Sequence, residues 1–441
     1  MAEGVVEELV EELEELDIAA EGNNWLVTET DVRMLMDKVA RHRYYKSDND
    51  SESASIMNMC TMLFNRDYEC QHLDNQCGKL CPTYPMNIII PIKERAADVA
   101  EAQFPSTSFD VDEFAPLVEQ SRFSRRHNRF PVPVILFCGK YICRSASVHP
   151  NVVSQWYEKD GRYRYFEDTD FQYGMTTTCA TYLLQNLKFQ RQIRKDVDVM
   201  RYCNIRYIFD LRMENRMGKR SEAVNASEPF YLQYYEEFKR ISVPYPESSE
   251  FKEFYFNRRV DLLHYNWNSI RDCFDFQLPE NDSIVPPPKI DFTKYKEWKV
   301  VMLTFNYFSL LLNYVTSTEK AILVQGNRGF DKTPLFITLL RLSLWADGLI
   351  HKSLNPIEMS YLTLAYDWYL FGHDLPKQFD KGYLIMLFCI HSIRYITWLR
   401  VRGSPKSHDD RLHQLTEVFE LLDGVYFDVL ETIKEERLDF S

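Results

Sequence analysis

Hydrophobic and polar residues follow two different periods along the chain, and each period predicts a type of element. Short runs rich in β-branched residues, such as "MNIIIPIKE" at 86–94, predict strands. The run "PVPVILFCGKYICRS" at 131–145 predicts a strand, a glycine-centred turn and a second strand. From 176 to 202 the apolar positions recur with helical spacing, and the stretch 205–211 that follows predicts a buried strand. Strands, loops and helices therefore alternate toward the centre of the chain.

Helical spacing dominates the carboxyl half of the chain. It predicts a helix from about 295 to 315, at least three helices beyond residue 333, and a helical segment after Arg402. Polar residues predict a loop or linker at 43–56, and three consecutive prolines predict another loop at 286–288. The whole pattern predicts an α/β fold, in which a mixed central sheet is flanked by helices and the carboxyl half is helical.

The first residues predict an acidic amphipathic helix. Val6, Leu9, Leu13 and Leu16 share one helical face, and glutamates occupy much of the rest. Such a helix either binds a protein partner through residues 5–18 or docks on its own domain with a solvated acidic face. Three parts are predicted in all. They are 1–80 with this helix, the polar linker and the start of the core, 81–402 for the main domain, and 403–441 for a carboxyl helical segment.

Charge and composition narrow the classes of function. The net charge of −13 argues against general nucleic-acid binding, because neutralising phosphates needs a cationic surface, and any anion site must be local. Ten cysteines without framework spacing, and an acidic amino terminus unlike a signal peptide, predict a cytoplasmic protein in a reducing compartment. The apolar stretches 300–315 and 383–399 are interrupted by polar residues, which predicts buried helices and only peripheral membrane contact.

A group of thiols near one histidine raises the question of a zinc site. Cys70, His72, Cys77 and Cys81 lack the paired short spacings that structural zinc sites use. Free thiols are expected instead, and the sequence predicts neither a metal ion nor a cofactor.

Other polar residues have structural interpretations. His351 and His373 are expected to be structural histidines with satisfied hydrogen bonds rather than ligands. In "FDLRMEN", Asp210 and Arg212 predict an ion pair at a strand end. The basic stretch 122–129 predicts a solvated loop, with contact to an anionic bilayer as the alternative.

The stretch "ILVQGNRGFDKTPLF" at 322–336 has the pattern of a phosphate-binding loop. An apolar strand leads into a loop with two glycines and a lysine, and Thr333 is expected to cap a helix whose first residue is Pro334. Such a helix start presents unpaired amides to an anion. A nucleotide-binding loop is disfavoured because the glycine it needs before the lysine is Asp331. The predicted phosphate-binding residues are Asn327, Arg328, Gly329, Phe330 and Lys332.

Several longer stretches resemble one family. They are "GFDKTPLFITLLRLSLWADGLIHKSL", "LAYDWYLFGH", "GKYICRSAS", "RYIFDLRMENR", "VPYP" and "NYFSLLLNYV". Together they resemble the myotubularin-related lipid phosphatases of the Jumpy branch over roughly residues 80 to 400. The resemblance implies a cysteine-dependent, tyrosine-phosphatase-like fold and, in active members, removal of the 3-phosphate from phosphatidylinositol 3-phosphate and the 3,5-bisphosphate. It also implies phosphoinositide head groups or a membrane surface as partners, with a cytoplasmic location that is peripheral on endomembranes.

The loop departs from the family pattern where the chemistry occurs. The family carries His-Cys at the loop start and an arginine near its end, where this chain has Gln325, Gly326 and Lys332. Asp331 matches the proposed general acid, so Asp331 and Lys332 are the remaining catalytic positions. Glycine cannot form a phospho-enzyme, and lysine lacks the bidentate geometry of arginine. The sequence thus predicts a pseudophosphatase, with a phosphatase that uses an unorthodox nucleophile and an interaction scaffold without a ligand as alternatives.

Two other cysteines have the spacing of a nucleophile, with five residues between the cysteine and an arginine. Cys138 precedes Arg144 in "CGKYICR", and Cys60 precedes Arg66 in "CTMLFNR". The first run predicts a hairpin and the second a helix, and neither offers small residues that aim amides at an anion. Neither cysteine is expected to be a nucleophile.

Overall fold

The computed structural model describes residues 26–44, 51–95, 108–148, 158–159, 162–163, 179–213, 233–252, 263–267, 275–284, 286–287 and 289–439. A five-stranded sheet lies at the centre, in the order β3, β4, β9, β7, β8. The strands are β3 (Val132–Phe137), β4 (Lys140–Ala146), β9 (Ala321–Gly326), β7 (Ile205–Asp210) and β8 (Lys239–Ser242). β3 is antiparallel to β4, and the other neighbours pair in parallel. The expected mixed sheet is confirmed.

The apolar character of these strands follows from their position. Every residue of β3, β4 and β9 is buried, as in sheets with both faces covered by other elements. The predicted strand, turn and strand at 131–145 is the β3–β4 hairpin, and the predicted strand at 205–211 is β7. Two smaller antiparallel sheets have two strands each. One is formed by β1 (Tyr68–Asp74) and β2 (Asn87–Glu94), and the other by β5 (Glu158–Lys159) and β6 (Arg162–Tyr163).

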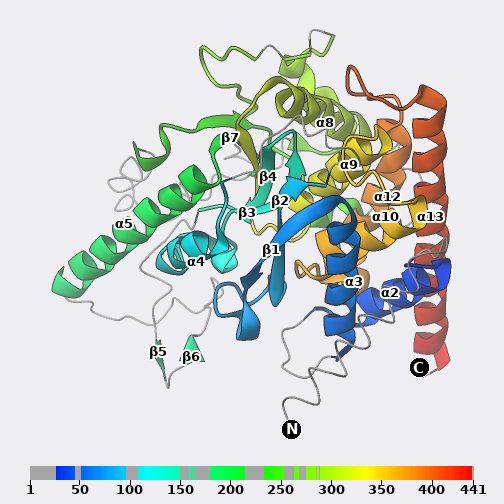
Figure 1. Cartoon of the computed structure of the whole chain (residues 1–441), viewed down its shortest axis with the longest axis horizontal. Helices are drawn as coiled ribbons and strands as arrows, with labels where there is room; N and C mark the ends of the chain where they lie inside the picture. The colour runs from blue at the N-terminus through cyan, green and yellow to red at the C-terminus, as the bar shows by residue number, and fades with distance from the viewer. Residues whose placement is uncertain are drawn as a thin grey trace.

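Helices cover the sheet and form most of the carboxyl half, which confirms that expectation. In the view of Figure 1, four of them gather on one side of the sheet, with α13 outermost, while α4 and α5 lie on the other side. The four are α9 (Lys332–Ala346), α10 (Pro356–Leu362), α12 (Ile385–Ile396) and α13 (His408–Asp439). The remaining helices are α2 (Glu29–Arg41), α3 (Ser51–Asp67), α4 (Val111–Gln120), α5 (Cys179–Tyr202), α8 (Val300–Ser317), α11 (Leu375–Lys381) and a π-helical turn (Thr363–Tyr369).

Two predicted boundaries are wrong. The predicted loop at 43–56 runs into α3, which begins at Ser51, because its polar first turn precedes a face that buries Ile56, Cys60 and Phe64. The predicted helix from 295 is a 3-10 turn (Phe292–Glu297) followed by α8, because Trp298 and Lys299 take extended backbone angles between them. The acidic segment 5–18 lies outside the described residues.

α8 is the one helix in the described part of the chain that is long and apolar enough to cross a membrane. However, 61% of its apolar window is buried inside the protein. Leu310, Leu311 and Tyr314 are fully buried, so α8 packs as a core helix, as the sequence predicts.

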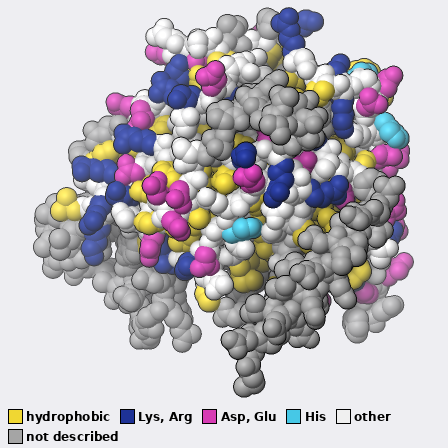
Figure 2. All heavy atoms as spheres, viewed as in Figure 1, with side chains coloured by type: hydrophobic (Ala, Val, Ile, Leu, Met, Phe, Trp, Pro, Cys, Tyr) yellow, Lys and Arg dark blue, Asp and Glu magenta, His cyan; other side chains and the backbone are white. Residues whose placement is uncertain are grey.

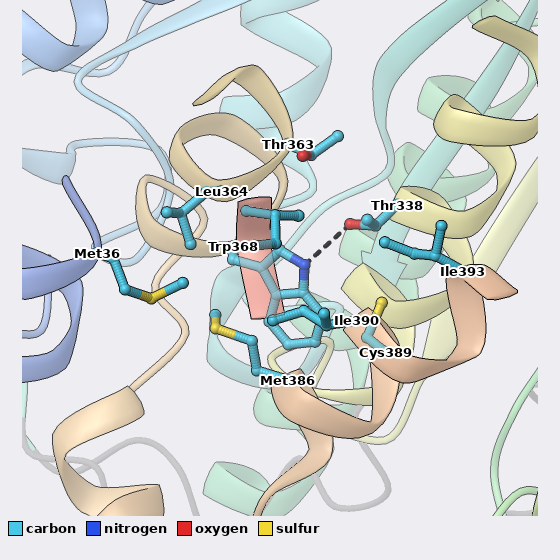
Figure 3. A pocket seen from close by; sticks show the side chains of 10 residues that line it. Met36, Thr338, Thr363, Leu364, Trp368, Met386, Cys389, Ile390 and Ile393 are labelled. Atoms are coloured by element: carbon cyan, nitrogen blue, oxygen red, sulfur yellow. Dashed lines mark hydrogen bonds between the residues drawn. The ribbon is translucent and has the colours of Figure 1, made fainter. Parts of the chain in front are cut away.

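The helical half is closely packed. One of its cavities measures about 20 Å³ and is enclosed mainly by apolar side chains from α2, α9, α12, α13 and the π-helical turn, as Figure 3 shows. The Trp368 indole nitrogen donates a hydrogen bond of 2.9 Å to Thr338 at its wall. A cavity of this size holds about one water molecule, so it is no site for an organic ligand.

Candidate functional site

The candidate site is the loop between β9 and α9. β9 ends at Gly326 and α9 begins at Lys332, so residues 327–331 join a buried strand to a buried helix. The neighbouring strands β4 and β7 run parallel to β9 and end beside it, at Ala146 and Asp210. Loops at the carboxyl ends of parallel strands are common ligand sites because side chains of several strands meet there. The fold therefore places the sequence-predicted loop at the edge where a ligand is expected.

The backbone of this loop directs its carbonyl oxygens into the protein. The oxygen of Gly326 accepts from the Ser147 amide at 2.8 Å, and that of Asn327 accepts from the Ser147 hydroxyl at 3.1 Å. No hydrogen bond among the described residues uses an amide of 327–331 as donor. Consecutive unpaired amides at a helix start are able to bind an anion, and the amides of 327–331 are called here the amide nest.

Gly329 is required for the shape of this nest. Its φ of +73° is in the left-handed region, where residues with a Cβ are strained. A Cβ at this position would also lie 3.0 Å from the Ser145 oxygen and 3.1 Å from Arg129 Nε. Both the backbone angle and the lack of space therefore call for glycine.

Gly326, at the expected nucleophile position, differs from Gly329. It belongs to strand β9 and has no positive φ, so its backbone accepts a side chain. A Cβ there would meet the Thr333 hydroxyl oxygen at 2.9 Å. That hydroxyl is fully buried and has no hydrogen-bond partner in the part of the chain that the structure describes. Thr333 lies within the first turn of α9, so the expectation that it caps a helix starting at Pro334 is wrong by two residues.

Lys332 is buried and engaged by the protein itself. Its side chain is 4% exposed, and Nζ donates to the carbonyl oxygens of Leu211 and Tyr245 at 2.9 Å each and to Glu247 Oε1 at 2.8 Å. An ammonium group has three donors. All three are used, so Lys332 has none left for a phosphate in this arrangement.

Asp331, the expected general acid, contacts a histidine. Its Oδ1 lies 3.0 Å from His373 Nδ1, which also approaches the Phe330 carbonyl oxygen at 3.1 Å. Both partners are acceptors, which assigns the proton to Nδ1. Burial acts to raise the pKa of Asp331, but hydrogen bonds from His373 and Ser248 hold that pKa below its usual range. Asp331 is therefore a carboxylate at neutral pH, which is the wrong form for an acid.

Two buried arginines lie behind the loop. Arg129 and Arg144 both donate to the Gly329 carbonyl oxygen, at 3.0 Å and 3.4 Å. Burial lowers the pKa of both, and the charge of Arg129 helps to bring the pKa of Arg144 to about 9. Neither forms an ion pair with a carboxylate among the described residues. Their positive charge therefore acts on the back of the amide nest.

Phe330 and Arg328 form the outer face of the loop. The Phe330 ring lies 4.3 Å from the Arg129 guanidinium and 5.3 Å from that of Arg43, and it contacts the His127 ring edge-on at 5.2 Å. Arg328 is exposed and lies close enough to Asp331 and His127 to lower the pKa of each. Arg328 is thus a cation of the loop that is open to solvent.

The other cysteines considered as nucleophiles lie in unsuitable places. Cys60 is fully buried in α3, and Cys138 lies in the β3–β4 turn. Burial raises the pKa of both thiols, which disfavours the reactive thiolate. Among the described residues, which include Cys70, His72, Cys77 and Cys81, no group of three or more His, Cys, Asp or Glu side chains is placed to hold a metal ion.

Three predictions concern residues outside the loop. The ion pair between Asp210 and Arg212 is confirmed at 2.6 Å. His351 is buried and its Nε2 lies 2.9 Å from Arg341 Nη1, but its Nδ1 has no hydrogen-bond partner among the described residues, so the expectation of satisfied hydrogen bonds is wrong for that atom. The solvated loop at 122–129 is wrong for Arg125 and Arg129, which are buried. Arg125 forms an ion pair with Asp196 at 2.7 Å, and such a pair compensates the cost of burying its charge.

The contacts that several residues make with the loop were not predicted from the sequence. His373 was expected to be a satisfied structural histidine, but it contacts Asp331 and its buried Nε2 has no partner. His373 ends the stretch "LAYDWYLFGH", Arg144 lies in "GKYICRSAS", and Glu247 follows "VPYP" directly. Position within these family-like stretches was the available signal, because hydrophobic spacing carries no information on such contacts.

One face of the molecule carries mixed charge. In the view of Figure 2, Lys and Arg side chains of the described residues are interspersed with Asp and Glu, so this face has no patch of a single sign of charge.

The fold and the loop together define a class. A mixed sheet carries a strand, an amide nest and a buried helix in series, which is the arrangement of the tyrosine-phosphatase-like, cysteine-dependent phosphatases, here with glycine at the nucleophile position. No family model matches the chain. Two curated proteins are similar: "Phosphatidylinositol-3,5-bisphosphate 3-phosphatase MTMR14" from Homo sapiens, 37% identical over 82% of this chain, and its namesake from Mus musculus, 36% identical over 82%.

Over 82% of its length the chain is thus similar to the myotubularin-related phosphoinositide 3-phosphatases of the Jumpy branch. It spans 57% of the length of the curated relatives that it matches. Their similarity confirms the family resemblance that the sequence motifs indicate.

Proposed function

We propose that this chain binds the 3-phosphorylated head group of a phosphoinositide in the amide nest and does not hydrolyse it. The observation that carries the proposal is Gly326, which leaves the nest without an attacking side-chain atom. The relatives are named for action on phosphatidylinositol 3,5-bisphosphate, which makes an inositol phosphate the expected ligand. Association with endomembranes from the cytoplasmic side follows from such a ligand.

Two features of the loop support binding without turnover. Covalent catalysis needs a thiolate that attacks phosphorus and an acid that protonates the leaving inositol oxygen. Gly326 cannot supply the first, and the lowered pKa of Asp331 argues against the second. The unpaired amides of 327–331 and the start of α9 still favour an anion, because both carry partial positive charge.

The binding part is tested by flotation of the full chain with vesicles. Vesicles of phosphatidylcholine with phosphatidylinositol 3-phosphate should recruit the protein, and vesicles with unphosphorylated phosphatidylinositol should not. Arg328→Glu should weaken recruitment about tenfold, because it reverses a cation at the site. Arg402→Glu is the matched control, since Arg402 is also exposed but belongs to the turn before α13. Equal recruitment of wild type and Arg328→Glu would exclude the loop as the lipid site.

The catalytic part is tested by release of inorganic phosphate from the same lipid. The unmodified protein should release none above background. The double substitution Gly326→Cys with Lys332→Arg should restore only slow release: position 326 accepts a side chain and the arginine regains a bidentate fork, while Asp331 stays ionised and protonates the leaving oxygen poorly. Release by the unmodified protein that disappears in Asp331→Ala would contradict the proposal and favour a phosphatase with another nucleophile.

A further inference from the structure

The side chain of Lys332 is held by three acceptors of different mobility. Two are the backbone oxygens of Leu211 and Tyr245, at 2.9 Å each, and the third is Glu247 Oε1 at 2.8 Å. Leu211 directly follows β7, whose carboxyl end is paired with β9, so its oxygen is fixed by the sheet. Of the three Lys332 N–H groups, the one bonded to Glu247 is therefore the one that a ligand can accept from.

The segment that carries Glu247 is anchored at both ends. Tyr245 is fully buried, its ring contacts Phe336 at 5.2 Å, and its hydroxyl lies 2.7 Å from that of Thr304. Phe251 is also fully buried and contacts Phe388 at 4.9 Å. Between these anchors the Glu247 side chain is 36% exposed. The backbone is thus fixed, while the carboxylate has solvent into which it can rotate.

We propose that Glu247 is an internal competitor for the phosphate. Its carboxylate occupies the Lys332 donor that an anionic ligand needs, and the ligand binds fully only when Glu247 rotates away. This inference rests on the proposed function of the nest, and it identifies the residue that sets the anion affinity. With Asp331 also ionised, two carboxylates balance Lys332 and Arg328 around the loop. Removing one of them adds to the positive charge that Arg129 and Arg144 already place behind the nest.

The lysine itself makes this competition necessary. A guanidinium has five N–H donors and an ammonium has three. An arginine at position 332 has enough donors to hold Glu247 and a phosphate together, whereas the three donors of Lys332 are all used by protein acceptors. Competition by Glu247 is therefore a direct consequence of lysine at this position.

The test measures binding to the full chain by isothermal titration, with two probes. One is short-chain, water-soluble phosphatidylinositol 3-phosphate and the other is inorganic phosphate, so the arms separate a lipid head group from the free anion. Glu247→Gln should bind the preferred probe about tenfold more tightly than wild type, which equals about 1.4 kcal/mol. Gln keeps an oxygen that can accept from Lys332, which favours correct folding. Glu247→Ala, which frees the donor completely, should bind at least as tightly.

Glu250→Gln is the matched control for net charge. Glu250 lies three residues further along, is exposed, and accepts from its neighbour Ser249. It should change affinity less than twofold, and unfolding midpoints should show that every variant is folded.

The outcomes separate this inference from the proposed function. Tighter binding by Glu247→Gln but not by Glu250→Gln supports the competitor, even where wild type binds too weakly to measure. Binding by wild type with equal or weaker binding by both Glu247 variants would overturn the competitor and leave the proposed function standing. Failure of every variant to bind either probe would overturn both. An equal increase in affinity in Glu247→Gln and Glu250→Gln would show that net charge causes the effect, and it would also overturn the role of Glu247 as a competitor.

Discussion

Gly326 and Gly329 lie three residues apart, at the end of β9 and in the loop that follows, but the same substitution should cost much more stability at Gly329. Gly326→Ala adds a Cβ to an extended backbone, with one close contact, the rotatable Thr333 hydroxyl. Gly329→Ala adds a Cβ at a φ of +73° among fixed atoms. Gly403, with a φ of +82° and no atom within 4 Å of its Cβ position, isolates the effect of the backbone angle.

The expected free energies follow from these contacts. A residue with a Cβ in the left-handed region loses about 1–2 kcal/mol, partly offset by about 0.4–1 kcal/mol because alanine restricts the unfolded chain. Gly403→Ala should therefore destabilise by about 1 kcal/mol. Gly329→Ala also crowds the Ser145 oxygen and Arg129 Nε at 3.0 and 3.1 Å, and overpacking adds about 1–3 kcal/mol. Its total is about 2–4 kcal/mol, whereas Gly326→Ala should stay within about 1 kcal/mol of wild type.

Urea unfolding followed by tryptophan fluorescence measures these differences, with the slope compared among variants so that midpoint shifts report stability. The expected order of stability is wild type close to Gly326→Ala, then Gly403→Ala, then Gly329→Ala. Equal losses in Gly329→Ala and Gly403→Ala would show that the nest is not crowded around Gly329. A loss above about 2 kcal/mol in Gly326→Ala would refute the argument that position 326 accepts a side chain.

Two further predictions concern buried charge. Arg341→Met should cost about 3–5 kcal/mol in urea unfolding, because it leaves the fully buried Asp367, now paired through two 2.9 Å bonds, without a counter-charge. Arg33→Met breaks the ion pair with Asp428, whose two side chains are 55% and 54% exposed, and should cost less than about 1 kcal/mol. Similar losses in Arg341→Met and Arg33→Met would show that burial does not set the cost of losing the ion pair. Burial first, and then nearby arginines, lower the pKa of His127 to about 3. The folded state resists the proton that the unfolded chain accepts near pH 6.5, so stability should fall as the pH drops from about 6.5 toward 3. The non-titrating His127→Asn, suited to the φ of 55°, should lose less stability than wild type between pH 7 and 5, and parallel pH profiles would refute this.

Short-range patterns in the sequence are enough to predict the local elements of this protein. The β3–β4 hairpin, the buried strand β7 and the series of β9, loop and α9 all follow from short-range rules, because hydrophobic period and turn residues act over a few positions. The chemical limit of the site also needs no coordinates, since Gly326 has no attacking atom in any fold. Boundaries were less certain, as α3 shows, because a polar first turn reads like a loop until its later residues are packed.

The partners of the loop residues depend on the three-dimensional fold. Lys332 has the charge of a phosphate ligand, yet its donors are taken by Glu247, which is 85 positions away in the chain, and by two carbonyl oxygens. Arg129 reaches Gly329 across 200 positions and His373 reaches Phe330 across 43. Such contacts depend on which strands become neighbours and which groups are buried together. A one-dimensional pattern shows that a charge is present, but the packed fold sets which partner neutralises it.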